Sequence, residues 1–218
     1  MGVRIEASGP LALFSRPEMK VERVSYDMIT PSAARGLLEA VYWHPGLSWK
    51  IDRIYVMNPI RFTNIRRNEV SEKLSADTVL TVLNGRDEPL YIASSEAIQQ
   101  RASTLLRDVR YIIDAHFEMT GKASETDSEQ KFYAVTMERL KRGKCFQQPY
   151  FGCREFPAKV TLFEGEPGKT AYEGEKDLGY MLFNMDYADL KDVKPRFFRA
   201  VLRDGMLDVA AARAGVVS

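Results

Sequence analysis

Apolar and polar residues alternate at the start of the chain and then change to a helical period. Residues 3–7 read Val-Arg-Ile-Glu-Ala, and this period of two predicts a strand. A helix is predicted after Thr30, because threonine suits the N-cap and Pro31 suits the first helical position. Apolar residues recur at helical spacing over 34–42, and Pro-Gly at 45–46 ends the helix. We expect Trp43 to close this helix against a sheet.

The middle of the chain predicts two long strands and a second helix. Residues 48–63 and 105–119 are the strands, and 129–142 repeats apolar residues at helical spacing. Between the strands, 64–100 is polar and irregular, with room for a short strand at 90–93. One face of the second long strand is apolar: Val109, Tyr111, Ile113, Ala115 and Phe117.

The last third of the chain is predicted to be mostly strand. A short strand at 159–164 precedes a loop rich in glycine and glutamate. Further strands are expected at 178–185 and 196–209, the second split by a turn at Asp204-Gly205. We expect residues 210–218 to fray.

The order of these elements predicts the fold class. β-α-β-β-α-β followed by extra strands is the split βαβ pattern. We therefore predict an α+β fold, with a ferredoxin-like (RRM-like) βαββαβ domain over 1–165 and a C-terminal antiparallel β extension over 166–218. The length of 218 residues agrees with one domain or one and a half, at ~150 residues each. The pattern alone does not set function, because RNA binders, small-molecule sensors and metal carriers share it.

Composition excludes several classes of protein. Lys+Arg is 31 and Asp+Glu is 30, so a uniformly basic surface is excluded, although a local basic face is not. Cys145 and Cys153 have neither disulfide-framework nor zinc spacing, and two histidines, His44 and His116, are too few for a three-histidine zinc site. We expect no metal and no cofactor. The chain has no run of 18 apolar residues and no signal-peptide core, so we expect a cytoplasmic protein without a membrane partner.

Two side chains are candidates for proton transfer. Alternation puts His116 on the face opposite Ala115 and Phe117, where it is either a hydrogen-bonded strand histidine or a general acid or base. Tyr42 lies at the end of the first helix, where it either joins an aromatic cluster or presents its phenol to a bound polar group.

Basic residues form local groups with aromatic residues between them. Each group alone is explained by a solvated face, but phosphate contact with base stacking requires this mixture. The candidates for RNA contact are Arg35, Arg66, Arg67, Lys141, Arg142 and Arg154. In the loop that holds Arg154, Gly152 permits a positive φ or a close backbone approach.

Five segments together carry a family resemblance. They are VSYD at 24–27, TPSAARGLLEAVYWHP at 30–45, NIRRNE at 64–69, DAHFE at 114–118 and YFGCREF at 150–156. The chain resembles the subtype I-C (Dvulg) CRISPR-associated endoribonucleases of the RAMP superfamily over nearly its whole length. The run at 30–45 is the most specific part.

The resemblance implies an RRM-like domain that cleaves the CRISPR repeat in precursor RNA without a required metal ion. The chain would then stay on the 5′ handle of the crRNA with the other subunits of the type I-C interference complex. Metal-free cleavage uses the ribose 2′-hydroxyl as nucleophile and leaves a 2′,3′-cyclic phosphate. Two alternatives stay open: a non-catalytic subunit that caps the handle, and a small-molecule-binding domain with no nucleic acid.

The resemblance also implies catalytic residues. The family's tyrosine maps onto Tyr42 and its histidine onto His116. The family's lysine is expected beside the histidine, where this chain has Asp-Ala at 114–115. A cation from elsewhere in the chain, such as Lys122 or Lys141, is an open substitute.

Overall fold

The computed structural model describes residues 2–19, 21–87 and 89–217, which divide into two compact units. The main unit comprises Met1–Thr63 with Thr104–Ser218, and the inserted unit comprises Asn64–Ser103. We describe each unit by itself, since the candidate chemistry lies mostly in the main unit.

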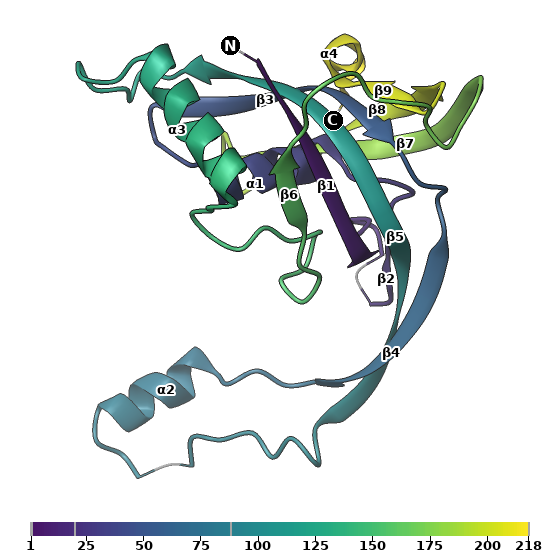
Figure 1. The fold of residues 1–218 in the computed structure, drawn as a ribbon. Coiled ribbons are helices and arrows are strands. Elements are labelled where there is room, and N and C mark those ends of the chain that lie inside the picture. The colour runs from purple at the N-terminus through teal and green to yellow at the C-terminus, as the bar shows by residue number, and fades with distance from the viewer. Residues whose placement is uncertain (1, 20, 88, 218) are drawn as a thin grey trace. The chain divides into compact units, whose positions relative to one another are not determined.

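An antiparallel sheet forms the framework of the main unit (Figure 1). Its strands are β1 (Gly2–Ala12), β2 (Arg23–Val24), β3 (Leu47–Val56), β5 (Ile98–Met119), β6 (Lys159–Leu162), β7 (Glu175–Asp186), β8 (Lys194–Arg203) and β9 (Met206–Asp208). They lie in the order β6-β1-β5-β3-β9-β8-β7, with β2 also paired to β5. The pairing of β3 with β5 confirms that the two long central strands are neighbours.

Helices α1 (Pro31–Val41) and α3 (Glu129–Arg142) begin and end where the sequence predicts. The Thr30 hydroxyl accepts a hydrogen bond from the Ala33 amide at 3.2 Å, which caps α1. The Ser128 hydroxyl accepts from the Lys131 amide at 3.2 Å in α3, and Gly143 ends that helix at φ 63°.

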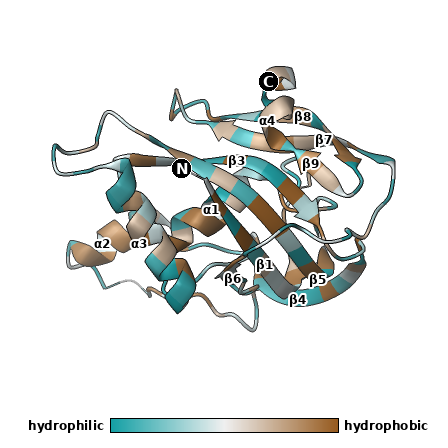
Figure 2. Ribbon diagram, turned by 45° about the horizontal axis from the view of Figure 1, so that its top comes forward, coloured by the Kyte–Doolittle hydropathy of each residue, from teal (hydrophilic) through white to brown (hydrophobic). Residues whose placement is uncertain are grey.

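The core lies between these helices and one face of the sheet. All five predicted apolar residues of β5 are buried. Phe117 contacts Trp49 of β3 at 5.5 Å between ring centroids and Phe132 of α3 at 6.3 Å, both edge-on. Figure 2 shows the alternation of hydrophilic and hydrophobic residues along the strands. The helix-covered face is therefore the face of Ala115 and Phe117, and His116 points to the other.

The single strand predicted for 48–63 is wrong, because the chain leaves the sheet between β3 and β4 (Phe62–Val70). Pro59 has no amide hydrogen for a strand ladder. Side chains replace the missing pairing: the Asn58 amide donates to the Asp108 carbonyl at 2.7 Å, and the Tyr172 hydroxyl accepts from the Ile60 amide at 2.7 Å.

The inserted unit holds a helix where the sequence predicts irregular chain. Helix α2 (Ala76–Leu83) is capped by Ser75, whose hydroxyl accepts from the Asp77 amide at 3.2 Å. It has no buried residue, although Ala76, Val79, Leu80 and Leu83 follow a helical spacing. The suggested strand at 90–93 is not observed, and β5 begins at Ile98, earlier than predicted.

Residues 209–217 form regular structure, so the expectation that the chain frays after Val209 is wrong as far as Val217. The turn at Asp204-Gly205 divides β8 from β9 as predicted. β9 then continues directly into α4 (Val209–Ala212), whose N-cap Asp208 accepts from the Ala211 amide at 2.9 Å. A short 3-10 helix (Arg213–Gly215) follows.

Gly152 anchors the loop after α3 to the segment after β1. Its φ is +81°, and a Cβ at this position would lie 1.8 Å from the Leu13 carbonyl oxygen. The neighbouring Phe151 is fully buried and packs edge-on against Phe14 and Tyr111. The close approach and the positive φ expected of this glycine are therefore both present.

Candidate functional site

His116 lies on the face of β5 that the helices leave open, and its side chain is 35% exposed. Its Nδ1 atom is 2.9 Å from each carboxylate oxygen of Asp52. Its Nε2 atom is 3.9 Å from Glu118, whose other oxygen pairs with Lys50 Nζ at 3.2 Å. We call Lys50, Asp52, His116 and Glu118 the charge cluster.

Asp52 lies on the face of His116, at an irregularity in the pairing of β3 with β5. Ile51 pairs with Ala115 and Arg53 pairs with Asp114, so Asp52 is the extra residue between two registered pairs. Such a bulge re-aims a side chain relative to simple alternation. Sequence reasoning missed Asp52, since a bulge depends on the partner strand and has no local sequence pattern here.

This geometry defines what the histidine can do chemically. An ionised carboxylate only accepts hydrogen bonds, so Nδ1 of His116 must donate to Asp52. In the neutral ring, Nε2 then carries the lone pair and can accept a proton. The arrangement supports a general base or, after protonation, a general acid at Nε2 of His116.

Tyr42 lies on the opposite side of the sheet from His116. It is the C-cap of α1, and its ring packs edge-on against Phe132 at 6.1 Å between centroids. The Arg139 guanidinium lies 5.1 Å from the ring centroid, and burial raises the pKa of the Tyr42 phenol. The structure therefore places Tyr42 in an aromatic cluster and does not bring it beside His116.

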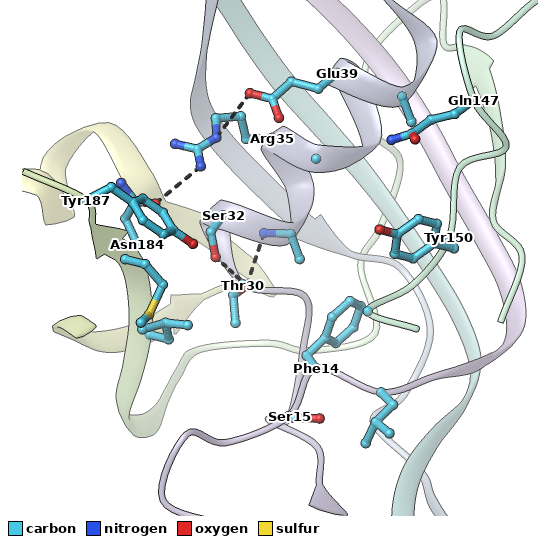
Figure 3. A pocket seen from close by; sticks show the side chains of 17 residues that line it. Phe14, Ser15, Thr30, Ser32, Arg35, Glu39, Gln147, Tyr150, Asn184 and Tyr187 are labelled. Carbon is cyan, nitrogen blue, oxygen red and sulfur yellow. Dashed lines mark hydrogen bonds and ion pairs between the residues drawn. The ribbon is translucent and has the colours of Figure 1, made fainter. Parts of the chain in front are cut away.

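Arg35 lines a pocket of about 430 Å³ between α1 and β7, drawn in Figure 3. Its Nη2 atom donates to the Asn184 side chain at 3.3 Å, and its Nε atom lies 3.4 Å from Glu39. Burial raises the pKa of the Glu39 carboxyl. Ser32 and Tyr150 add hydroxyl groups to the same wall.

The remaining basic candidates lie in separate places. Lys141 and Arg142 occupy the last turn of α3, where Arg142 pairs with Glu138 at 3.1 Å. Arg154 is exposed in the loop that Gly152 anchors. Arg66 and Arg67 lie on β4 in the inserted unit. Within the main unit, Arg35, Lys141, Arg142 and Arg154 thus lie on different elements and are not gathered at His116.

Two further observations concern the described part of the chain. Over residues 2–19, 21–87 and 89–217, no helix combines the length and the apolar character needed to cross a membrane. Over the same residues, no three His, Cys, Asp or Glu side chains form a group that could hold a metal ion.

The family described as CRISPR-associated protein (Cas_Cas5) matches residues 2–210, and the chain therefore belongs to this family. The match confirms the resemblance found in the sequence.

Two relatives and one solved structure make the comparison more specific. The chain is 45% identical over 213 residues to "CRISPR pre-crRNA endoribonuclease Cas5d" of Mannheimia succiniciproducens, covering 95% of this chain and 94% of that protein. It is 35% identical over 228 residues to the protein of the same name from Thermus thermophilus, covering 97% and 92%. A solved structure titled "Crystal Structure of CRISPR-associated Protein" has a TM-score of 0.71 at 20% identity, covering 100% of this chain and 97% of that one.

Proposed function

We propose that this protein is an endoribonuclease that cuts the CRISPR repeat in precursor crRNA. The observation that carries the proposal is the 45% identity, over 95% of the chain, to a relative named for this activity. We further propose that it stays bound to the 5′ handle as a subunit of the type I-C interference complex. A non-catalytic handle-capping subunit is the alternative function.

We infer that β1, α1, β3, β5, α3 and β6 form a ferredoxin-like core. The antiparallel order β6-β1-β5-β3 supports this inference, because the fold places its fourth, first, third and second strands in that sequence across the sheet. We further propose that residues 1–165 form the catalytic domain and that residues 166–218 form a β extension.

The proposed reaction is an attack by the ribose 2′-oxygen on the adjacent phosphorus. The new 2′-O–P bond closes the cyclic phosphate, and the P–O5′ bond breaks. Nε2 of His116 takes the 2′-hydroxyl proton or returns a proton to the 5′-oxygen. The Asp52 hydrogen bond at 2.9 Å supports this role, since it engages Nδ1 and leaves Nε2 on the side of the ring away from Asp52. Lys50 is the lysine of the charge cluster, and its ammonium would stabilise the negative charge of the phosphorane.

The test of function is incubation of the purified protein with a labelled repeat hairpin. We expect one cut within the repeat, a 2′,3′-cyclic phosphate on the 5′ product, and tighter binding at low salt because phosphates are contacted. Binding without any product would support the handle-capping alternative. Weak binding whose affinity does not depend on salt concentration would contradict both the endoribonuclease and the handle-capping function.

Cleavage is expected to continue at an unchanged rate in excess chelator. The proposed mechanism supplies the nucleophile from the RNA itself and the proton transfer from His116, so no step requires a metal-bound water. The measurement is a time course with and without EDTA. Loss of activity that Mg²⁺ or Mn²⁺ restores would contradict metal independence and redirect attention to Asp52 and Glu118 as ligands.

Replacing Asp52 with asparagine is expected to lower the cleavage rate by roughly 10²-fold or more while repeat affinity stays within about twofold. The asparagine amide can donate to Nδ1 of His116, which moves the ring proton to Nε2 and removes the acceptor. Rate measurements under saturating protein, combined with imidazole ¹⁵N shifts, check this result. Asp52→Glu keeps a carboxylate and should recover part of the rate, and Glu173→Gln, an exposed carboxylate in the 164–174 loop, is the control.

A further inference from the structure

Two aromatic rings stack on each other at the surface beside the end of α1. Trp43 and Phe146 have centroids 6.2 Å apart and ring planes 30° apart. Their exposed fractions are 52% and 62%. The expectation that Trp43 closes the helix against the sheet is therefore wrong, and Trp49 takes that place instead. We call the two rings the Trp43–Phe146 platform.

Hydrogen bonds to backbone carbonyls at the end of α1 hold the segment that carries Phe146. The amides of Phe146 and Gln147 donate to the Ala40 carbonyl at 2.8 and 3.0 Å. Arg139 Nη1 donates to the Val41 carbonyl at 2.8 Å. These bonds satisfy carbonyls that the end of a helix leaves without partners. The segment after α3 is thus fixed to the end of α1, and a ligand need not order the two rings.

The charge next to the platform is positive. The segment 138–146 contains four cations, Arg139, Lys141, Arg142 and Lys144, and one carboxylate, Glu138. Glu138 lies 3.1 Å from Arg142 and 3.9 Å from Lys144, so one negative charge faces two cations. An open groove of about 580 Å³ starts beside the platform and is lined by Arg139, Lys144 and Lys159.

We propose that the Trp43–Phe146 platform stacks an unpaired base of the bound RNA, while the neighbouring cations contact its phosphates. A flat aromatic surface beside a positive groove matches single-stranded RNA, which offers a base face and a phosphate at each nucleotide. An apolar protein partner would use the rings but not the excess positive charge beside them. The inference rests on the proposed RNA-binding function and assigns one subsite to it.

The chain offers a direct optical test, because its two tryptophans are Trp43 at the surface and Trp49, which is 2% exposed. In the Trp49→Phe variant, Trp43 is the only fluorophore of its kind. Titration with the repeat RNA should quench the emission of Trp43 and protect it from acrylamide. The midpoint of this titration should equal the midpoint of a fluorescence anisotropy titration with labelled RNA. Trp43→Phe in the otherwise unchanged protein should abolish the RNA-dependent quenching, which keeps the test valid if Trp49→Phe folds poorly.

Affinity gives the second measurement. Trp43→Ala should weaken repeat binding by roughly 5- to 150-fold, the loss expected for one stacked base. Phe146→Ala should weaken it in the same direction. Tyr180→Ala is the matched control, since Tyr180 is 63% exposed on β7, and it should leave affinity unchanged.

Each outcome decides between the two claims. Two results together support the platform as a base-binding subsite. RNA quenches the emission of Trp43 in the Trp49→Phe variant, and Trp43→Ala binds the repeat more weakly. The platform is overturned if RNA binds normally, Trp43 emission does not change on binding, and Trp43→Ala keeps its affinity. The proposed function is then unaffected. The platform is also overturned if Trp43→Ala binds RNA normally but no longer binds purified subunits of the complex. That result would assign the surface to a protein partner. No RNA binding by the wild-type protein overturns the proposed function and the platform together.

Discussion

Replacement of His116 by alanine is expected to lower the cleavage rate by roughly 10²–10⁴-fold, the usual contribution of a positioned proton-transfer group. Repeat affinity should change little, because such a group acts mainly in the transition state. The fold should survive, since His116 lies on the open face and its side chain is 35% exposed. Single-turnover cleavage and equilibrium binding measured on the same preparation separate the two effects.

Two controls sharpen the assignment. A repeat with a 2′-deoxyribose 5′ of the scissile phosphate should bind and stay uncut, because its nucleophile is gone. Tyr42→Phe removes only a hydroxyl across the sheet from His116. A rate loss comparable to that of His116→Ala would place both residues in one step, and a wild-type rate would leave cleavage to His116 without Tyr42. Wild-type cleavage by His116→Ala would refute the role proposed for this histidine.

Replacement of Gly152 by alanine is expected to destabilise the protein by roughly 2–5 kcal/mol. A left-handed φ costs an L-residue about 1–2 kcal/mol, and forcing an extra methyl into a packed site costs about 1–3 kcal/mol more. Both terms apply, because φ is +81° and the added Cβ would lie 1.8 Å from the Leu13 carbonyl oxygen. The measurement is the midpoint of urea unfolding at constant m-value.

Gly36→Ala is the matched control and should move stability in the opposite direction. Gly36 lies within α1, and a Cβ there would meet no atom within 4 Å. Glycine inside a helix costs roughly 0.5–1 kcal/mol relative to alanine, so this variant should gain about that amount. Equal stability of Gly152→Ala and wild type would mean that the loop at 150–156 is not anchored as described.

Local chemistry made the helices predictable. Thr30 and Pro31 define the start of α1, and the apolar spacing over 129–142 defines α3, because a cap and a helical period need only neighbouring residues. The buried face of β5 was predictable for the same reason. Helix α2 was missed because its capping serine and its apolar spacing extend over only eight residues, within a segment that is polar elsewhere.

The site was predictable only as far as single strands allow. Alternation predicted the face of His116 relative to Phe117, and the structure confirms it. Asp52 stands 64 residues away along the chain and meets His116 through a bulge, which exists only once β3 and β5 are paired. The relation of Tyr42 to His116 likewise depends on which face α1 covers, and Trp43 is exposed while Trp49 and Phe117 are buried on that face.

The position of β1 between β5 and β6 affects how the protein is made. β1 is synthesised before both of its partners, which are residues 106–116 on one side and residues 159–162 on the other. At about 5–20 residues per second, this strand remains unpaired for several seconds to tens of seconds with both edges open. Open strand edges favour association between chains. A nascent or truncated chain that stops before Leu106 therefore leaves both edges of β1 open to association with other chains.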